Sequence, residues 1–125
     1  MSTDKRPVNL NLFTMKFPMP AIASILHRIS GFILFFLIPI ALFGLQQSLT
    51  SELGFAGVCA FFHNPVLRVL LWASLSALIY HLIAGIRHLI MDVGVGETLE
   101  GGRRGTAIVF IFSIVLIILL GWWLW

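Results

Sequence analysis

The chain has 125 residues, of which 59% are hydrophobic and only 10% are charged, with a formal net charge of +3. Soluble domains carry about 25% charged residues, so this composition excludes a soluble globular domain and indicates an integral membrane protein. The little chain that remains outside apolar segments also excludes a separate soluble catalytic domain.

The N-terminal segment, MSTDKRPVNLNLFTMKF, contains no apolar run of the kind that a cleaved signal peptide requires. Asp4 and the absence of an amphipathic, arginine-rich pattern also argue against a mitochondrial transit peptide. We therefore expect a multi-pass protein of a bacterial inner membrane.

Three apolar segments follow, and each is long enough to cross a bilayer, which takes about 20 residues of helix. They run approximately over residues 21–49, 66–91 and 106–125. The sequence therefore predicts an all-α membrane protein, a single membrane-anchor domain over residues 1–125 with three transmembrane helices joined by short connections.

Basic residues gather on one side of these spans and predict their orientation. Lys5, Arg6, Lys16 and Arg28 lie before or at the start of the first span, and Arg87, Arg103 and Arg104 flank the second connection. The first connection has only Arg68, and the chain closes with GWWLW, whose tryptophans suit a membrane interface. We expect the N-terminus in the cytoplasm and the C-terminus in the periplasm.

The first predicted span begins with polar residues in the stretch PAIASILHRISGF. Ser24 and Arg28 are four residues apart and share a helix face, where a hydroxyl and a guanidinium would form a donor pair for a carbonyl oxygen or a carboxylate. The alternative interpretation is that Arg28 only marks the cytoplasmic boundary and reaches toward lipid headgroups. Spacing alone leaves both interpretations open.

The second predicted span carries two histidines on a stripe of small residues. At 100° per residue, one face collects Ser74, Ala77, Leu78, His81, Ala84, Gly85 and His88. Small residues allow a backbone or a flat cofactor to approach closely, so His81 either ligates a haem iron or hydrogen-bonds a neighbouring helix. His81 and His88 lie about 10 Å apart on one side of a helix and cannot be opposite ligands of one iron. A haem with two histidine ligands therefore implies a second membrane subunit.

The third predicted span has no charged residue, and we interpret it as a packing element with a lipid-facing side. The connection before it, DVGVGETLEGGRRG, is glycine-rich and polar, and we interpret it as a turn. No carboxylate lies within the three spans, which disfavours an ion-coupled transporter.

Three motifs in order resemble one family. RPVNLNL at residues 6–12, SILHRISG at residues 24–31 and HLIAGIRHLIMD at residues 81–92 together resemble the cytochrome b large membrane-anchor subunit of succinate dehydrogenase, respiratory complex II. The resemblance implies that His81 is the axial ligand of haem b iron and that Ser24 and Arg28 belong to a ubiquinone site. It also implies that His27 and Arg28 contact the haem propionates.

The same resemblance implies the cofactors and partners. Haem b would be shared with a second small membrane-anchor subunit, and FAD and iron-sulfur clusters would reside in a flavoprotein subunit and an iron-sulfur subunit. Electrons from succinate would reduce ubiquinone at the membrane boundary, as part of the respiratory chain and the tricarboxylic acid cycle, and the chain alone would not oxidise succinate. The lipid bilayer is the other expected partner, and no nucleic acid is expected. A haem-free hydrophobic anchor of a related quinol:fumarate reductase is the alternative.

Overall fold

The computed structural model describes residue 11 and residues 14–125, and in this part of the chain all regular structure is helical. Four helices follow one another: α1 (Met19–Thr50), α2 (Glu52–Phe61), α3 (Pro65–Asp92) and α4 (Leu99–Leu124). Lys5, Arg6 and most of the motif at residues 6–12 lie outside the described residues. The all-α fold class expected from composition is confirmed.

Three of the helices are long and apolar enough to span a membrane: α1 with 32 residues, α3 with 28 and α4 with 26. At about 1.5 Å per residue they measure about 48, 42 and 39 Å, which exceeds the roughly 30 Å of a bilayer's hydrocarbon core. The three membrane-spanning helices predicted from the sequence are therefore present, and each has turns to spare at its ends.

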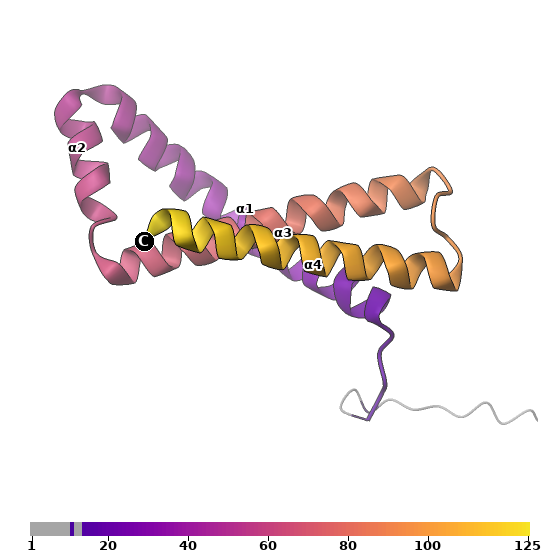
Figure 1. The fold of residues 1–125 in the computed structure, drawn as a ribbon. Coiled ribbons are helices and arrows are strands. Elements are labelled where there is room, and N and C mark those ends of the chain that lie inside the picture. The colour runs from indigo at the N-terminus through magenta and orange to yellow at the C-terminus, as the bar shows by residue number, and fades with distance from the viewer. Residues whose placement is uncertain (1–10, 12–13) are drawn as a thin grey trace, which may run out of the picture.

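The long helices form a crossed arrangement (Figure 1). α3 and α4 run antiparallel as a hairpin, and the N-terminal half of α1 crosses this pair. The C-terminal half of α1 diverges, and α2 returns the chain to the start of α3. The start of α1, the end of α3 and the start of α4 therefore lie at one end of the molecule, and the C-terminus lies at the other.

The crossing is built from small and polar side chains rather than from a large apolar core. The buried residues in the described part of the chain are Ala23, Ser30, Ala84, Arg87, Gly102, Thr106, Val109 and Ser113. Helices inside a bilayer gain nothing from hiding leucine from lipid, so they associate through close backbone approach and interhelical hydrogen bonds. The large apolar side chains point outward instead, as expected for a surface that faces lipid or another membrane subunit.

Side-chain hydrogen bonds connect the helices at the crossing. Trp72 on α3 donates its indole N–H to the carbonyl of Ile117 on α4, at 3.1 Å. The Tyr80 hydroxyl on α3 donates to the carbonyl of Ala23 on α1, at 2.9 Å. These bonds satisfy polar groups that would otherwise face lipid, and they define how α3 sits between its two neighbours.

Helix α2 was not expected, because the sequence predicted only a short connection between the first two spans. Its ten residues form a helix about 15 Å long, which is too short to cross a membrane. A prediction based on apolar segments of about 20 residues therefore does not detect it. Ser51 begins it by accepting a hydrogen bond from the Gly54 amide at 3.0 Å, and Asn64 begins α3 by accepting from the Val66 amide at 2.9 Å. Such capping residues allow two helices to follow each other closely.

The interpretation of the whole second connection as a turn was wrong. Only residues 93–98 lie outside helices, and Gly94 and Gly96 there adopt positive φ values of 86° and 79°. Thr98 caps α4 by accepting from the Gly101 amide at 3.0 Å, so α4 starts at Leu99 instead of near Thr106. The polar, glycine-containing first turns of α4 hide this start from a hydropathy pattern.

Candidate functional site

Two predicted site residues, His27 and His81, meet where α1 crosses α3, together with Ser30 and His88. His27 and Ser30 come from α1, and His81 and His88 come from α3, seven residues apart and therefore on one face of that helix. The His27 ring stacks on the His81 ring with centroids 4.2 Å apart and an angle of 10° between the planes. It also meets the His88 ring at 5.0 Å and 44°. The three imidazoles form one cluster, called the histidine cluster below.

Two glycines allow the histidine cluster to form. A Cβ atom on Gly31 of α1 would lie 2.9 Å from Cε1 of His81, and a Cβ atom on Gly85 of α3 would lie 3.3 Å from Nε2 of His27. Real Cβ atoms essentially never approach another atom to 2.9 Å. His27 of α1 therefore packs against the small-residue stripe that the sequence predicted on the second span. Gly31 of α1 leaves the space that the His81 ring occupies.

The hydrogen bonds of His81 indicate which of its ring nitrogens has a lone pair that could bind a ligand. Its Nδ1 lies 3.1 Å from the carbonyl oxygen of His27 and 3.1 Å from the Ser30 hydroxyl. Ser30 itself donates to the same His27 carbonyl at 2.8 Å. A carbonyl oxygen can only accept, so the contact with the His27 carbonyl is a hydrogen bond in the tautomer that carries its proton on Nδ1, and this tautomer has its lone pair on Nε2.

That lone pair is not used within the described residues. Nε2 of His81 makes no hydrogen bond there, and it is not sealed from its surroundings. A histidine that ligates a metal typically donates its other ring N–H to a backbone carbonyl, a carboxylate or a water, which orients the ring and selects the tautomer. The carbonyl of His27 supplies this arrangement for His81.

His27 differs from His81 because its Nε2 atom is buried and has no hydrogen-bond partner within the described residues. A buried polar atom without a partner is uncommon in native structures and marks a place where a ligand, an ion or a water is expected. The unsatisfied nitrogen lies inside the histidine cluster, close to the backbone of Gly85.

Ser24 and Arg28 lie one turn apart on α1, as their spacing predicted. Ser24 is half-buried and Arg28 is exposed. Neither side chain makes a hydrogen bond or an ion pair to any residue that the structure describes, since the only ion pair there joins Arg104 to Glu100. Their donors are therefore available to a ligand at the same end of the molecule as the histidine cluster.

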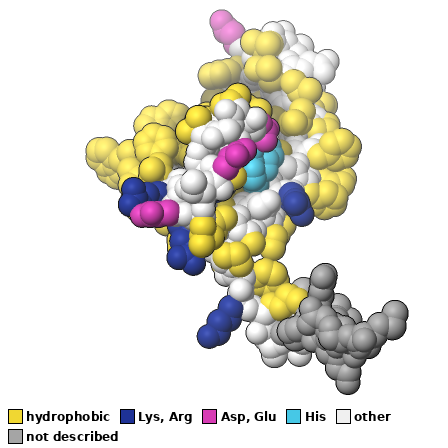
Figure 2. Space-filling model, turned by 90° about the vertical axis from the view of Figure 1, so that its right-hand side faces the viewer, with side chains coloured by type: hydrophobic (Ala, Val, Ile, Leu, Met, Phe, Trp, Pro, Cys, Tyr) yellow, Lys and Arg dark blue, Asp and Glu magenta, His cyan; other side chains and the backbone are white. Residues whose placement is uncertain are grey.

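The cluster lies close to the charged end of the molecule. Figure 2 shows this end, where a histidine side chain is visible among acidic and basic side chains. Arg87, expected at the second connection, is instead buried against α4, where its guanidinium donates to the carbonyl of Gly102 at 3.1 Å. Its side chain therefore contacts α4 and not the histidine cluster.

Sequence reasoning assigned no role to three residues that shape the site: Ser30 and Gly31, which contact His81, and Tyr80, which bonds the Ala23 carbonyl beside Ser24. Ser30 and Gly31 follow His27 by three and four residues, so their position on the His27 face was readable from the sequence. Their contact with His81 was not, because helical spacing does not say which helix faces them.

Within residue 11 and residues 14–125, no three histidine, cysteine or carboxylate side chains converge to hold a bare metal ion. The donors of the cluster are imidazole nitrogens, among them Nε2 of His81 beside the small residue Gly31. Such a set fits a metal that brings most of its ligands with it, as the iron of a haem does.

The chain is similar to known proteins over nearly its whole length. Residues 2–120 match the family model described as succinate dehydrogenase/fumarate reductase transmembrane subunit. A Coxiella burnetii protein named succinate dehydrogenase cytochrome b556 subunit is 43% identical over 122 residues, which cover 97% of this chain and 98% of that protein. Proteins of the same name from Paracoccus denitrificans and Rickettsia felis are 33% and 34% identical, over 91% and 94% of this chain and 88% and 91% of their own lengths.

Proposed function

Because the chain belongs to the succinate dehydrogenase/fumarate reductase transmembrane subunit family, we propose that it is the haem b-binding membrane anchor of a succinate:ubiquinone oxidoreductase. Its three membrane-spanning helices and its bacterial relatives make it a multi-pass protein of a bacterial inner membrane. Those relatives are named as subunits of succinate dehydrogenase, an oxidoreductase.

The observation that carries the haem proposal is the bonding of His81. Nδ1 is committed to the His27 carbonyl, and Nε2 is left with an accessible lone pair, which is the state in which an imidazole ligates iron. When bound, haem b supplies a one-electron redox centre. A second membrane-anchor subunit would supply the other histidine, since His88 lies on the same side of α3 as His81.

His27 and Arg28 contact the propionates of that haem. The buried Nε2 of His27 has no partner within the described residues, and the guanidinium of Arg28 is exposed without a counter-ion there. A carboxylate at this position would offer both groups the acceptor that they lack.

Ser24 and Arg28 form part of the ubiquinone site. Ser24 donates a hydrogen bond to one carbonyl oxygen of the quinone, and Arg28 stabilises the negative charge that grows on that oxygen during reduction. Reduction to the quinol takes up two electrons and two protons. A site at the charged end of the helices lies close to water that replaces those protons, and His27 is placed to pass them on.

That end faces the cytoplasm, as the distribution of basic residues predicts. Lys16, Arg28, Arg103 and Arg104 belong to segments that meet there (Figures 1 and 2). The iron-sulfur subunit docks on this face and carries electrons from the flavoprotein subunit, so the chain contributes anchoring and a quinone site but does not oxidise succinate alone.

The proposal is tested on the complex purified with its partner subunits. His81→Leu removes the ligating nitrogen, and we expect the loss of the low-spin, two-histidine spectrum of the reduced haem. His88→Leu is the matched control, because it removes an imidazole from the same face of the same helix, and we expect it to leave most of that spectrum intact.

Two results would contradict the assignment. An unchanged spectrum in His81→Leu would place the ligand elsewhere, with His88 as the next candidate. A complex that contains all its subunits but shows no b-type band would indicate a haem-free anchor, a function that the family description also covers because it includes fumarate reductase.

A further inference from the structure

Arg87 is a buried cation without a counter-ion in the described part of the chain. Its side chain is only 9% exposed, although it belongs to a membrane-spanning helix. Its one hydrogen bond runs from Nη2 to the carbonyl of Gly102, and the only ion pair among the described residues joins Arg104 to Glu100. Arginine presents five N–H donors, so most of its donor capacity is unused by the described residues, and no carboxylate there pairs with its charge.

A buried guanidinium such as that of Arg87 would be stabilised by an anion bound next to it. Ionisable residues inside membrane proteins usually pair with an opposite charge or mark a binding site, because neither lipid tails nor apolar side chains stabilise the charge. The His81 site does not supply the anion, since Arg87 packs against α4 and the histidine cluster lies between α3 and α1.

A cavity of about 420 Å³ lies beside Arg87, between α3 and α4. This volume falls within the roughly 300–1,000 Å³ of typical small-molecule sites. Apart from two arginines and three glycines its walls are apolar, formed by Ile83, Ile86, Ile90, Met91, Val95, Ile108 and Val109. None of the predicted haem or quinone residues lines it.

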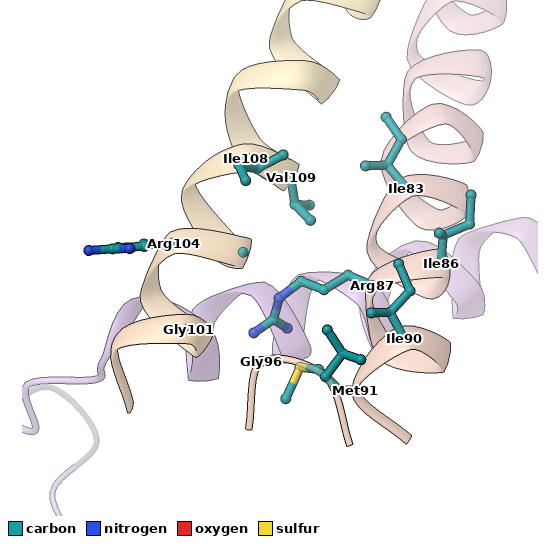
Figure 3. A pocket seen from close by; sticks show the side chains of 12 residues that line it. Ile83, Ile86, Arg87, Ile90, Met91, Gly96, Gly101, Arg104, Ile108 and Val109 are labelled. Carbon is teal, nitrogen blue, oxygen red and sulfur yellow. The ribbon is translucent and has the colours of Figure 1, made fainter. Parts of the chain in front are cut away.

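The two arginines of the cavity differ in direction. Figure 3 shows the Arg87 guanidinium directed from α3 across the space toward α4, whereas Arg104 extends away from it. Arg104 is also exposed and paired with Glu100. Arg87 is therefore the one cationic group that faces the apolar walls.

The cavity lies near the ends of two membrane-spanning helices, where lipid headgroups are expected. Arg87 is five residues before the end of α3, or about 7.5 Å along the axis, and Gly101 and Gly105 on the cavity wall belong to the first two turns of α4. Basic pockets between transmembrane helices at this level suit the phosphate of an anionic lipid.

We propose that this cavity is a binding site for an anionic membrane phospholipid. The phosphodiester oxygens accept hydrogen bonds from Arg87, and one acyl chain lies along the isoleucines of α3 and α4, among them Ile83 and Ile108. A neutral quinone would leave the Arg87 charge uncompensated, and free phosphate would leave the apolar walls without a ligand. The lipid matches both features, and the site is independent of the haem and quinone proposals.

The test measures lipid binding by the complex purified in nonionic detergent and stripped of loosely held lipid. The probe is dioleoyl phosphatidylglycerol, compared with dioleoyl phosphatidylcholine and with inorganic phosphate, and bound lipid is counted by mass spectrometry of the intact complex. We expect one retained phosphatidylglycerol with an affinity about tenfold higher than that of phosphatidylcholine, as a charge-assisted contact provides.

Two variants distinguish the contribution of the Arg87 charge to lipid binding from that of the apolar walls, and a third variant is the control. Arg87→Gln keeps an amide donor for Gly102 but removes the charge, so we expect it to abolish the preference for phosphatidylglycerol. Ile108→Trp fills the cavity from the lipid-exposed wall and leaves Arg87 in place, and we expect it to lower the binding of both lipids. Arg104→Gln removes a neighbouring cation that points away from the cavity, and its binding should equal that of the unaltered complex.

Several outcomes would overturn the proposal. Arg87→Gln and the unaltered complex could bind phosphatidylglycerol equally, or Arg87→Gln could lose bound quinone and keep its lipid. Inorganic phosphate could displace the lipid from the unaltered complex, or the unaltered complex could retain no lipid at all. If Arg87→Gln does not assemble, unchanged lipid binding in Ile108→Trp is sufficient to reject the site. Haem spectrum and quinone activity, measured on the same samples, report on the proposed function separately.

Discussion

The ring nitrogens of His81 have different environments, and this difference is the most informative residue-level feature of the protein. Nδ1 has a carbonyl and a hydroxyl within 3.1 Å, whereas Nε2 has no partner in the described part of the chain. A histidine with a purely structural role would need only the hydrogen bond at Nδ1. It would not need small residues such as Gly31 around the rest of its ring. Ser30 and Gly31 orient the ring, so the proposed ligand depends on residues of another helix.

At the same scale, the proposed quinone site predicts two separable activities. Ser24→Ala removes a donor with little change in volume, and loss of a donor to a developing oxyanion costs about 2.7 to 4 kcal/mol in the transition state. We expect Ser24→Ala and Arg28→Leu to depress succinate:quinone activity strongly. Succinate oxidation with a soluble dye that accepts electrons from the partner subunits should remain near normal in the assembled complexes.

Ser48→Ala is the control for this experiment, because Ser48 lies on the same helix and bonds only the carbonyl of Leu45. It should change neither activity. Haem content is measured alongside, since Arg28 is also proposed to contact a propionate. Equal loss of both activities, or no loss of either, would identify Ser24 and Arg28 as structural residues.

Among the elements, the crossing of α1 over α3 decides the geometry of the site. Both helices present small residues at the contact, Ala23 and Gly31 on α1 and Ala84 and Gly85 on α3. Close approach brings His27 between the two histidines of α3. Beyond this contact α1 diverges from the hairpin (Figure 1), so substitutions in the two halves of α1 should have different effects.

A pair of glycine substitutions tests this difference. A side chain at Gly31 would collide with the His81 ring, at 2.9 Å from Cε1, whereas nothing lies within 4 Å of a Cβ atom at Gly44. We expect Gly31→Val to displace His81 and to lower the haem content of the purified complex by about tenfold or more, the effect typical of disturbed ligand orientation. Gly44→Val, which introduces the same β-branched residue in the same helix, should retain its haem. Equal haem in both variants would contradict the close contact.

The whole molecule is asymmetric along its long axis. The start of α1, the end of α3 and the start of α4 lie toward one end, and the C-terminus lies at the other (Figure 1). If all three long helices span the membrane, we expect the start of α1 and the end of α4 on opposite sides of it. Which side is cytoplasmic rests on the basic residues, because lysine and arginine near the ends of spans are retained there.

Reporter fusions test this orientation. A reporter that is active only in the periplasm should work when fused after Trp125 and fail when fused after Gly96, in the connection between α3 and α4. A reporter that is active only in the cytoplasm should give the reverse pattern. The opposite result with both reporters would invert the protein and remove the cytoplasmic position of the proposed quinone site.

Properties that depend on local composition were predicted from the sequence. Twenty consecutive apolar residues identify a membrane span wherever it packs, because the solvent is lipid on every side. For that reason the three long helices are present as expected. The short helix α2 and the early start of α4 were missed because they depend on capping by Ser51 and Thr98 rather than on hydropathy.

Helical spacing also placed Ser24 and Arg28 on one face of α1 and both histidines of α3 on one face of that helix. The resemblance of three motifs suggested the roles of these residues, and those roles stay predictions. Only the packing of the helices shows that His27 faces His81, that Ser30 and Gly31 orient that ring, and that Arg87 contacts α4. The physical reason is that periodicity specifies the faces of one helix. The partner of each face is decided by close approach and hydrogen bonds between segments far apart in the sequence, such as His27 and His81, which are 54 positions apart.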